Sequence, residues 1–273
     1  MDSNQIQRIL TGIVLVPVVL GLVWFAPPQL FGLLAAIVAL LALREYLDLA
    51  DKSGLAPLRY PALLFGGLVV ILQVLESPIP LELLLVPLLV MLAVVLAMRA
   101  PRDLAQSLGS AASTVLGVLY VAMPFGLLVA LRQEPKGAYL VLYVLLLIWI
   151  GDTAAYYAGR AFGRHKLAPR ISPGKTWEGT IASLAGSLVL GFFFVGHFFP
   201  RVPLWLNLIT AVAVNTAGQA GDLAESALKR GAGVKDSGSF LPGHGGVLDR
   251  VDALLFAIPV LWYDIHLALG LYL

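Results

Sequence analysis

The sequence contains no cysteine, and its charged residues are few. The absence of cysteine excludes disulfide bonds, thiolate nucleophiles and zinc or iron–sulfur sites built from cysteine. Asp, Glu, Lys and Arg make up 12% of the 273 residues, whereas a soluble domain has about 25%. Apolar residues make up 59%, and the mean hydropathy is +0.90. So little polar surface cannot cover a soluble globule, and we therefore expect a membrane protein.

Long apolar runs predict membrane-spanning helices, each of which needs roughly 20 mostly apolar residues. The runs are rich in Leu and Ala and do not alternate, so neither strands nor a membrane barrel are expected. The first run continues directly after Pro27 and Pro28, so we expect it to be retained rather than cleaved as a signal peptide. The predicted fold is an all-α, polytopic transmembrane protein. About nine spans are expected, at residues 9–26, 30–47, 60–76, 81–98, 110–131, 138–158, 180–199, 203–223 and 251–272.

Basic residues predict the orientation of these helices, because Lys and Arg concentrate in the cytoplasmic segments of membrane proteins. With the N-terminus in the cytoplasm, 15 of the 18 basic residues lie inside. Only Arg132, Lys136 and Arg201 then lie outside. We therefore predict a multi-pass membrane protein with its polar site on the cytoplasmic side. The expected location is the cell inner (cytoplasmic) membrane.

The two halves of the chain differ in their connections. Residues 1–100 are expected to form N-terminal transmembrane helices with short loops. Residues 101–273 are expected to form a C-terminal transmembrane catalytic region. This region carries the long cytoplasmic loops 159–179 and 224–250, both rich in Gly, Pro, Lys and Arg.

Four polar residues share one face of the eighth predicted helix. Asn215, Gln219, Asp222 and Ser226 recur at helical spacing. Asp222 lies near the cytoplasmic end of that helix, where an acid is costly unless it is paired, exposed to water or bound to metal. Asp222 is therefore a candidate metal ligand.

Two further acids begin the ninth predicted helix. Asp249 and Asp252 are three residues apart, so they share a face. Two carboxylates together with substrate phosphates are the usual ligands of Mg²⁺. We therefore expect Asp222 and Asp249 to hold Mg²⁺, and the surplus of acids leaves room for a second cation.

The loop between these acids is rich in basic residues and glycines. Glycines let backbone N–H groups approach an anion closely, and the start of the ninth helix adds a positive dipole end. Taken singly, Asp249 is equally explained as a helix cap, and Lys229 and Arg230 as contacts to anionic headgroups. Their concentration in one stretch favours a phosphate site. Its candidates are Lys229, Arg230, Lys235, His244, Gly245, Gly246 and Arg250.

The stretch from Ser226 to Asp252 resembles the signature of the phosphatidate cytidylyltransferases, or CDP-diacylglycerol synthases. That pattern runs Ser-x-apolar-Lys-Arg, four residues, Lys-Asp, a Gly-rich turn and His-Gly-Gly-x-x-Asp-Arg-x-Asp. Every fixed position is present. Segments 151–160 and 172–179 are also similar to the family, although Gly174 stands where we expect lysine.

The resemblance implies a reaction of CTP with phosphatidic acid that gives CDP-diacylglycerol and pyrophosphate. It further implies magnesium dependence and a homodimer. The residues with implied catalytic roles are Asp222, Lys229, Arg230, Lys235, Asp236, His244, Asp249, Arg250 and Asp252. The residues with implied substrate-binding roles are Asp152, Lys175, Ser226, Gly245 and Gly246. Whether Asp152, Lys175, Asp236 and Asp252 support the metal, face cytosine or contact the lipid phosphate stays open.

Two other functions stay open beside this one. A related CTP-dependent enzyme would act on another lipid phosphate or on a polyprenol. A secondary transporter would place acids at mid-membrane, whereas most acids of the second half are predicted at the cytoplasmic helix ends. The bilayer is the expected surrounding, and no nucleic-acid partner is expected.

Overall fold

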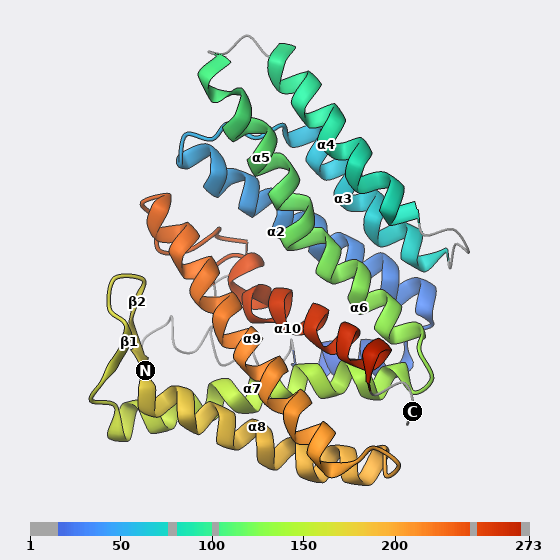
Figure 1. Cartoon of the computed structure of the whole chain (residues 1–273), viewed down its shortest axis with the longest axis vertical. Helices are drawn as coiled ribbons and strands as arrows, with labels where there is room; N and C mark the ends of the chain where they lie inside the picture. The colour runs from blue at the N-terminus through green and yellow to red at the C-terminus, as the bar shows by residue number, and fades with distance from the viewer. Residues whose placement is uncertain (1–15, 76–80, 100–103, 241–244, 269–273) are drawn as a thin grey trace. The chain divides into compact units, whose positions relative to one another are not determined.

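A computed structural model describes residues 16–75, 81–99, 104–240 and 245–268, and these residues are mostly helical (Figure 1). They fall into two compact units, which are described separately. The first unit takes its residues from Met1–Ala130 and Leu228–Val251, and the second from Leu131–Ala227 and Asp252–Leu273. Two helices, α9 (Leu204–Gly231) and α10 (Leu248–Leu267), contribute residues to both units.

The first unit is built on helices from the N-terminal half of the chain. These are a short helix at Val16–Phe25, then α2 (Pro28–Lys52), α3 (Arg59–Val74), α4 (Leu81–Arg99), the 3₁₀ turn η1 (Leu104–Gln106), α5 (Ser107–Gly117), the π-helical segment η2 (Val118–Ala122) and most of α6 (Met123–Gln133). Helix α2 packs along α3, α4 packs along α5, and η2 contacts both α2 and α3.

The ends of α2 follow from its sequence. Pro28 occupies the first helical position, where its missing N–H would have had no partner and its fixed φ suits the helix. At the other end, Gly54 adopts a φ of +80°, a conformation that favours glycine and ends the helix. The helix therefore extends past the predicted span 30–47 on both sides, and its last turns carry polar residues beyond the apolar run.

The second unit contains α7 (Gly137–Phe162), the strands β1 (Lys166–Ala168) and β2 (Ser172–Thr176), α8 (Trp177–Phe198), and parts of α9 and α10. Helices α7 and α8 run along each other (Figure 1). Gly151 of α7 makes this approach possible, because a Cβ there would lie 2.5 Å from Asn215 Nδ2 and 2.7 Å from Ser183 Oγ. The missing side chain of Gly151 thus lets α8 and α9 approach α7 closely.

The structure contains a short β-hairpin, although no strands were expected from the sequence. Strand β1 pairs antiparallel with β2, with Lys166 opposite Thr176 and Ala168 opposite Ser172. Both strands lie inside the predicted cytoplasmic loop 159–179. They are too short to show a hydrophobic period, so sequence patterns give no signal for them.

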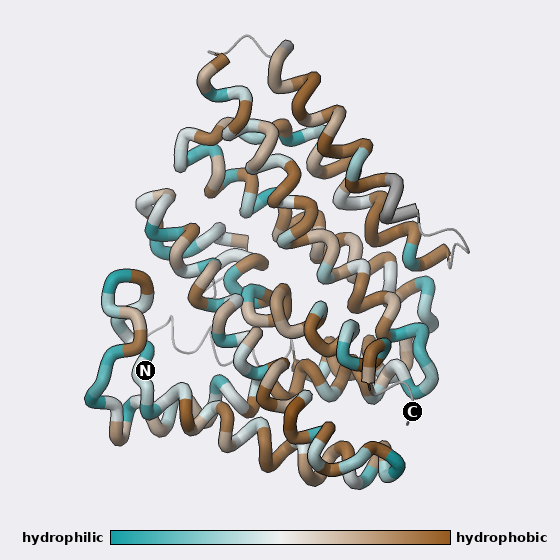
Figure 2. The backbone as a smooth tube through the Cα atoms, viewed as in Figure 1, coloured by the Kyte–Doolittle hydropathy of each residue, from teal (hydrophilic) through white to brown (hydrophobic). Residues whose placement is uncertain are grey.

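Among the residues that the structure describes, four helices are long and apolar enough to cross a membrane, namely Pro28–Lys52, Leu104–Gln133, Gly137–Phe162 and Trp177–Phe198. Shorter apolar helices lie at Val16–Phe25, Arg59–Val74 and Leu85–Met98. Figure 2 shows that α4 is mostly hydrophobic, whereas the β1–β2 hairpin mixes hydrophilic and hydrophobic residues. The all-α membrane class is confirmed apart from the short β1–β2 hairpin. The number of nine spans and the orientation stay predictions.

Candidate active site

A cavity of about 520 Å³ lies within the second unit. Its walls come from α7, β2, α8 and α9, and both acidic and basic side chains line it. The lining residues that carry charge are Asp152, Arg160, Lys175 and Asp222. The structure therefore brings three residues predicted from sequence, Asp152, Lys175 and Asp222, to the same cavity.

Asp222 and Lys175 form an ion pair in this cavity. Lys175 Nζ lies 2.7 Å from Asp222 Oδ2, and their side chains are 24% and 34% exposed, respectively. Ser226 Oγ lies 3.4 Å from Asp222 Oδ1, one helical turn further along α9. The negative charge of Asp222 is thus compensated by the Lys175 ammonium.

A short chain of amides and hydroxyls leads along α9 to the cavity. Gln219 Nε2 donates to Asn215 Oδ1 at 2.6 Å, and Asn215 Nδ2 donates to Ser187 Oγ at 2.7 Å and to Ser183 Oγ at 3.0 Å. This arrangement confirms that Asn215 and Gln219 share a helix face. Buried polar groups need such partners, so these contacts fix α9 against α8.

The hairpin that carries Lys175 is attached to the start of α8. The Thr176 side chain caps this helix by accepting from Gly179 N at 3.2 Å. Glu178 accepts from the backbone N of His165 at 3.2 Å and lies 2.7 Å from His165 Nδ1. These contacts place Lys175 at the cavity. The Arg160 guanidinium donates to Tyr156 Oη at 3.1 Å, so both side chains lie on one face of α7.

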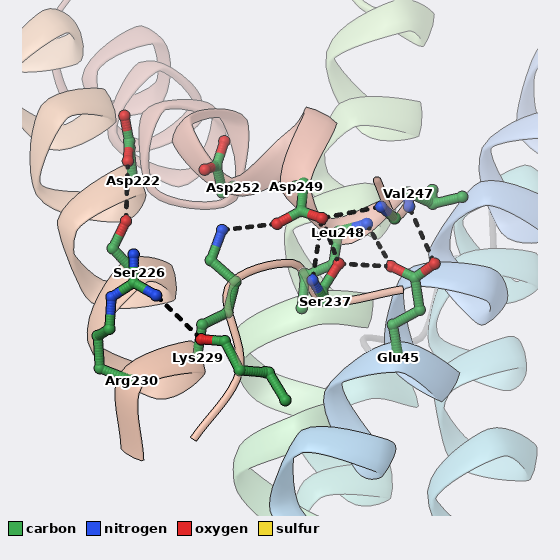
Figure 3. A network of polar contacts seen from close by, with 12 residues as sticks. Glu45, Asp222, Ser226, Lys229, Arg230, Ser237, Val247, Leu248, Asp249 and Asp252 are labelled. Carbon is green, nitrogen blue, oxygen red and sulfur yellow. Dashed lines mark hydrogen bonds and ion pairs between the residues drawn. The ribbon is translucent and has the colours of Figure 1, made fainter. Parts of the chain in front are cut away.

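In the first unit, Asp249 is the centre of a second polar cluster (Figure 3). Its Oδ1 accepts from Lys229 Nζ at 2.6 Å. Its Oδ2 accepts from Ser237 N at 3.0 Å, Ser237 Oγ at 3.0 Å and Gly246 N at 2.8 Å. The Lys229 and Asp249 side chains are only 12% and 7% exposed. Asp249 is thus held by a cation and by backbone donors at the start of α10.

Glu45 joins the same cluster, and sequence reasoning missed it. It lies on α2, is 8% exposed, and accepts from Val247 N at 3.0 Å and Leu248 N at 2.8 Å. Ser237 Oγ lies 2.9 Å from Glu45 Oε2, between the two carboxylates (Figure 3). The sequence did contain a signal for Glu45, because this acid lies in the last turn of the predicted span 30–47. An acid there is costly unless it has a partner, which is the argument that selected Asp222.

The glycines predicted to line a phosphate pocket lie against these carboxylates. Gly245 has a φ of +78°, and a Cβ there would lie 2.7 Å from Asp249 Oδ2. A Cβ on Gly246 would overlap Ser237 Oγ and Glu45 Oε2. In the structure these two glycines lie against the carboxylates of Asp249 and Glu45. Their role in binding phosphate stays a prediction.

The other predicted site residues are not among the cavity-lining residues or the hydrogen-bond partners of Asp249 named above. Arg230 Nη1 donates to the Val234 carbonyl at 3.1 Å at the surface. Asp252 Oδ1 accepts from Ala253 N at 2.7 Å. The exposed residues include Lys235, Asp236 and Arg250. His244 lies outside the described residues.

Metal binding by Asp222 and Asp249 stays a prediction, because Asp222 belongs to the second compact unit and Asp249 to the first. Within the described ranges, no three His, Asp or Glu side chains gather as a metal site. The donor set nevertheless suits Mg²⁺, which usually takes one or two carboxylates and completes its shell with water and phosphate. Asp222 and Asp152 line one cavity, and the Lys175 ammonium lies where a cation would neutralise Asp222.

Several helices are long and apolar enough to cross a membrane, and one cavity is lined by both acidic and basic side chains. These features define a helical membrane protein whose polar site suits phosphate-bearing molecules. The chain belongs to the cytidylyltransferase family, because residues 6–268 match the sequence pattern of that family. The resemblance found in residues 226–252 is thereby confirmed.

Relatives named phosphatidate cytidylyltransferase are similar to this chain over nearly its whole length. One from Haemophilus influenzae is 36% identical over 283 aligned positions, which cover 94% of this chain and 97% of the relative. One from Pseudomonas aeruginosa is 37% identical over 259 positions, covering 93% and 94%. One from Staphylococcus aureus is 35% identical over 250 positions, covering 89% and 94%.

Proposed function

We propose that this protein is a phosphatidate cytidylyltransferase. A phosphate oxygen of phosphatidic acid attacks the α-phosphorus of CTP, and a new P–O bond forms. The bond from the α-phosphorus to the bridging oxygen breaks, and pyrophosphate leaves with the electron pair. The products are CDP-diacylglycerol and pyrophosphate. The charges balance without any proton transfer.

The observation that carries this proposal is the cavity lined by Asp152, Arg160, Lys175 and Asp222. It is large enough for several phosphate groups, since pockets for small molecules start at about 300 Å³. It also combines cations that bind phosphate oxygens with carboxylates that bind a divalent ion. The family and the names of the relatives support the same reaction.

The chemistry asks the protein for positioning and charge neutralisation rather than for a general base. The attacking phosphate monoester is already ionised near neutral pH, so no Ser-His-Asp arrangement is needed. Lys175 and Arg160 are placed to bind phosphate oxygens, and Arg160 can do so through two parallel N–H groups. Holding two anionic groups together in this way is how phosphoryl-transfer sites lower the barrier.

Magnesium is the expected cofactor. Asp222 is the proposed principal ligand, with Asp249 as its predicted partner and Asp152 as a further acid in the cavity. When bound, Mg²⁺ would neutralise the triphosphate charge and the charge that develops on pyrophosphate. Lys175, which pairs with Asp222, is placed in the same cavity to bind a phosphate oxygen.

The proposed orientation places the site at the cytoplasmic face of the cell inner membrane. CTP is water-soluble and phosphatidic acid is a bilayer lipid, so a site near the helix ends is accessible to both. The basic-residue distribution supports this orientation. The nine spans and the homodimer belong to the same proposal.

The direct test is transfer from radiolabelled CTP in mixed micelles of detergent and phosphatidic acid. Purified protein should place the label in the lipid phase only when Mg²⁺ is present. Polyprenyl phosphate and lysophosphatidic acid serve as competing acceptors. If the label goes preferentially into polyprenyl phosphate, the related CTP-dependent enzyme is the better assignment. Ion flux in liposomes without CTP consumption would instead favour a transporter.

A further inference from the structure

Glu45 is a buried carboxylate to which the proposed reaction gives no role. It lies on α2, about 200 residues from its partners in sequence. Those partners are the Val247 and Leu248 backbone N–H groups and the Ser237 hydroxyl. The N–H groups at the start of a helix have no acceptor within the helix. A negative charge there is also stabilised by the helix dipole.

We propose that Glu45 is a positioning residue that acts through the start of α10 and holds Asp249 and Lys229 in place for nucleotide transfer. This role rests on the proposed function. Asp249 belongs to the first turn of α10, directly after Leu248, and Ser237 Oγ lies within 3.0 Å of both Glu45 and Asp249. Any displacement of Glu45 is therefore transmitted to the Asp249 carboxylate and to the Lys229 ammonium bound to it.

Two glycines show that the surrounding backbone is fitted to this carboxylate. A Cβ at Gly238 would lie 2.5 Å from Glu45 Oε1, and one at Gly246 would overlap Glu45 Oε2. Either contact would force the Glu45 carboxylate to shift away from the backbone N–H groups that donate to it. Both glycines thus make room for Glu45 from the loop side.

A change in this cluster should affect catalysis as well as folding. Reacting groups must be held close to their productive geometry, and a misplacement of about 1 Å can cost on the order of 100-fold in rate. Loss of folded protein lowers kcat and leaves KM for CTP unchanged. A displaced Asp249 and Lys229 also change KM for CTP, so the two causes are distinguishable.

The test is Glu45→Gln in the labelled-CTP assay, with Asp48→Asn as the matched control. Glutamine keeps the shape but turns one acceptor oxygen into an NH₂ donor. The Val247 and Leu248 N–H groups bind different oxygens, so one of them must face a donor. Asp48 lies one turn further along α2 at the surface, and its substitution removes the same charge. We expect kcat/KM to fall at least fivefold and KM for CTP to rise at least threefold in Glu45→Gln, with Asp48→Asn within twofold of the wild type.

A folded Glu45→Gln protein with a smaller loss, or with an unchanged KM, overturns the proposal, as does an equal loss in Asp48→Asn. If Glu45→Gln does not fold, Ser237→Ala decides, because it removes only the hydroxyl between the two carboxylates. A threefold or larger loss of kcat/KM in Ser237→Ala, with an unchanged melting temperature, then supports the proposal, and a smaller loss overturns it. Wild-type protein that forms no labelled lipid refutes the proposed function itself, and this role with it.

Discussion

The ion pair between Lys229 and Asp249 should be the most sensitive electrostatic contact of the first unit. The two side chains are 12% and 7% exposed and their charged atoms are 2.6 Å apart. Substituting Lys229→Met removes the cation and leaves a nearly buried carboxylate. Breaking a buried pair in this way costs about 3–5 kcal/mol. Asp249 keeps its bonds to Ser237 and Gly246, so we expect a value near the lower end.

That cost should be visible as a lower melting temperature in detergent. For a chain of this size, ~3 kcal/mol corresponds to a decrease of roughly 6–12 °C. The control is Asp48→Asn, which breaks a pair with Arg59 whose side chains are 40% and 39% exposed. A surface pair is worth ~0–1 kcal/mol, so the control should melt within about 4 °C of the wild type.

The double variant Lys229→Met with Asp249→Asn separates the two roles of the pair. Asparagine can keep one oxygen for the three donors now bound to Asp249 Oδ2, and the variant has no unpaired buried charge. We expect it to regain at least half of the lost melting temperature while labelled-CTP transfer stays at least tenfold below the wild type. A Lys229→Met protein that melts within 2 °C of the wild type, on the roughly 2–4 °C per kcal/mol scale, would refute the reasoning, as would a double variant less stable than the single one.

Two further predictions concern the second unit. Lys175→Met should reduce kcat/KM for CTP on the order of 100-fold, a loss typical of removing one charge-stabilising group. It should change stability by less than ~1 kcal/mol, because the Lys175–Asp222 pair is partly exposed. Activity above a tenth of the wild type would contradict a phosphate-binding role. Gly151→Ala should destabilise the protein by ~1–3 kcal/mol, because the added Cβ clashes with Asn215 and Ser183. The helical control is Gly196→Ala, where a Cβ meets nothing within 4 Å. In the same thermal melt the control should be neutral or slightly stabilising.

The helices could be predicted from sequence because long apolar runs are a strong signal. The predicted span 138–158 lies within α7 (Gly137–Phe162), and 180–199 overlaps α8 (Trp177–Phe198). The ends were less accurate, since α9 continues to Gly231 through charged residues that no hydropathy pattern includes. The β1–β2 hairpin was missed because its strands are short and depend on contacts with the start of α8.

The candidate site was predictable in part. A family signature and helical spacing were enough to select Asp222 and Asp249. The pairing of Asp222 with Lys175 depends on the hairpin, so no spacing rule gives it. Glu45 was missed because its partners Ser237 and Val247 lie about 200 residues away in the sequence, so no local spacing links it to the site.

The most direct test of the proposed function is labelled-CTP transfer by Asp222→Asn, with and without a chelator. The wild type should form labelled CDP-diacylglycerol with Mg²⁺ and none with EDTA. Asp222→Asn should fold in detergent and retain less than about a tenth of the wild-type rate, consistent with losing a charge-stabilising group. A folded Asp222→Asn protein that exceeds that rate, or a wild type that EDTA does not inhibit, would contradict the assignment of Asp222 as the acid that holds magnesium at the triphosphate.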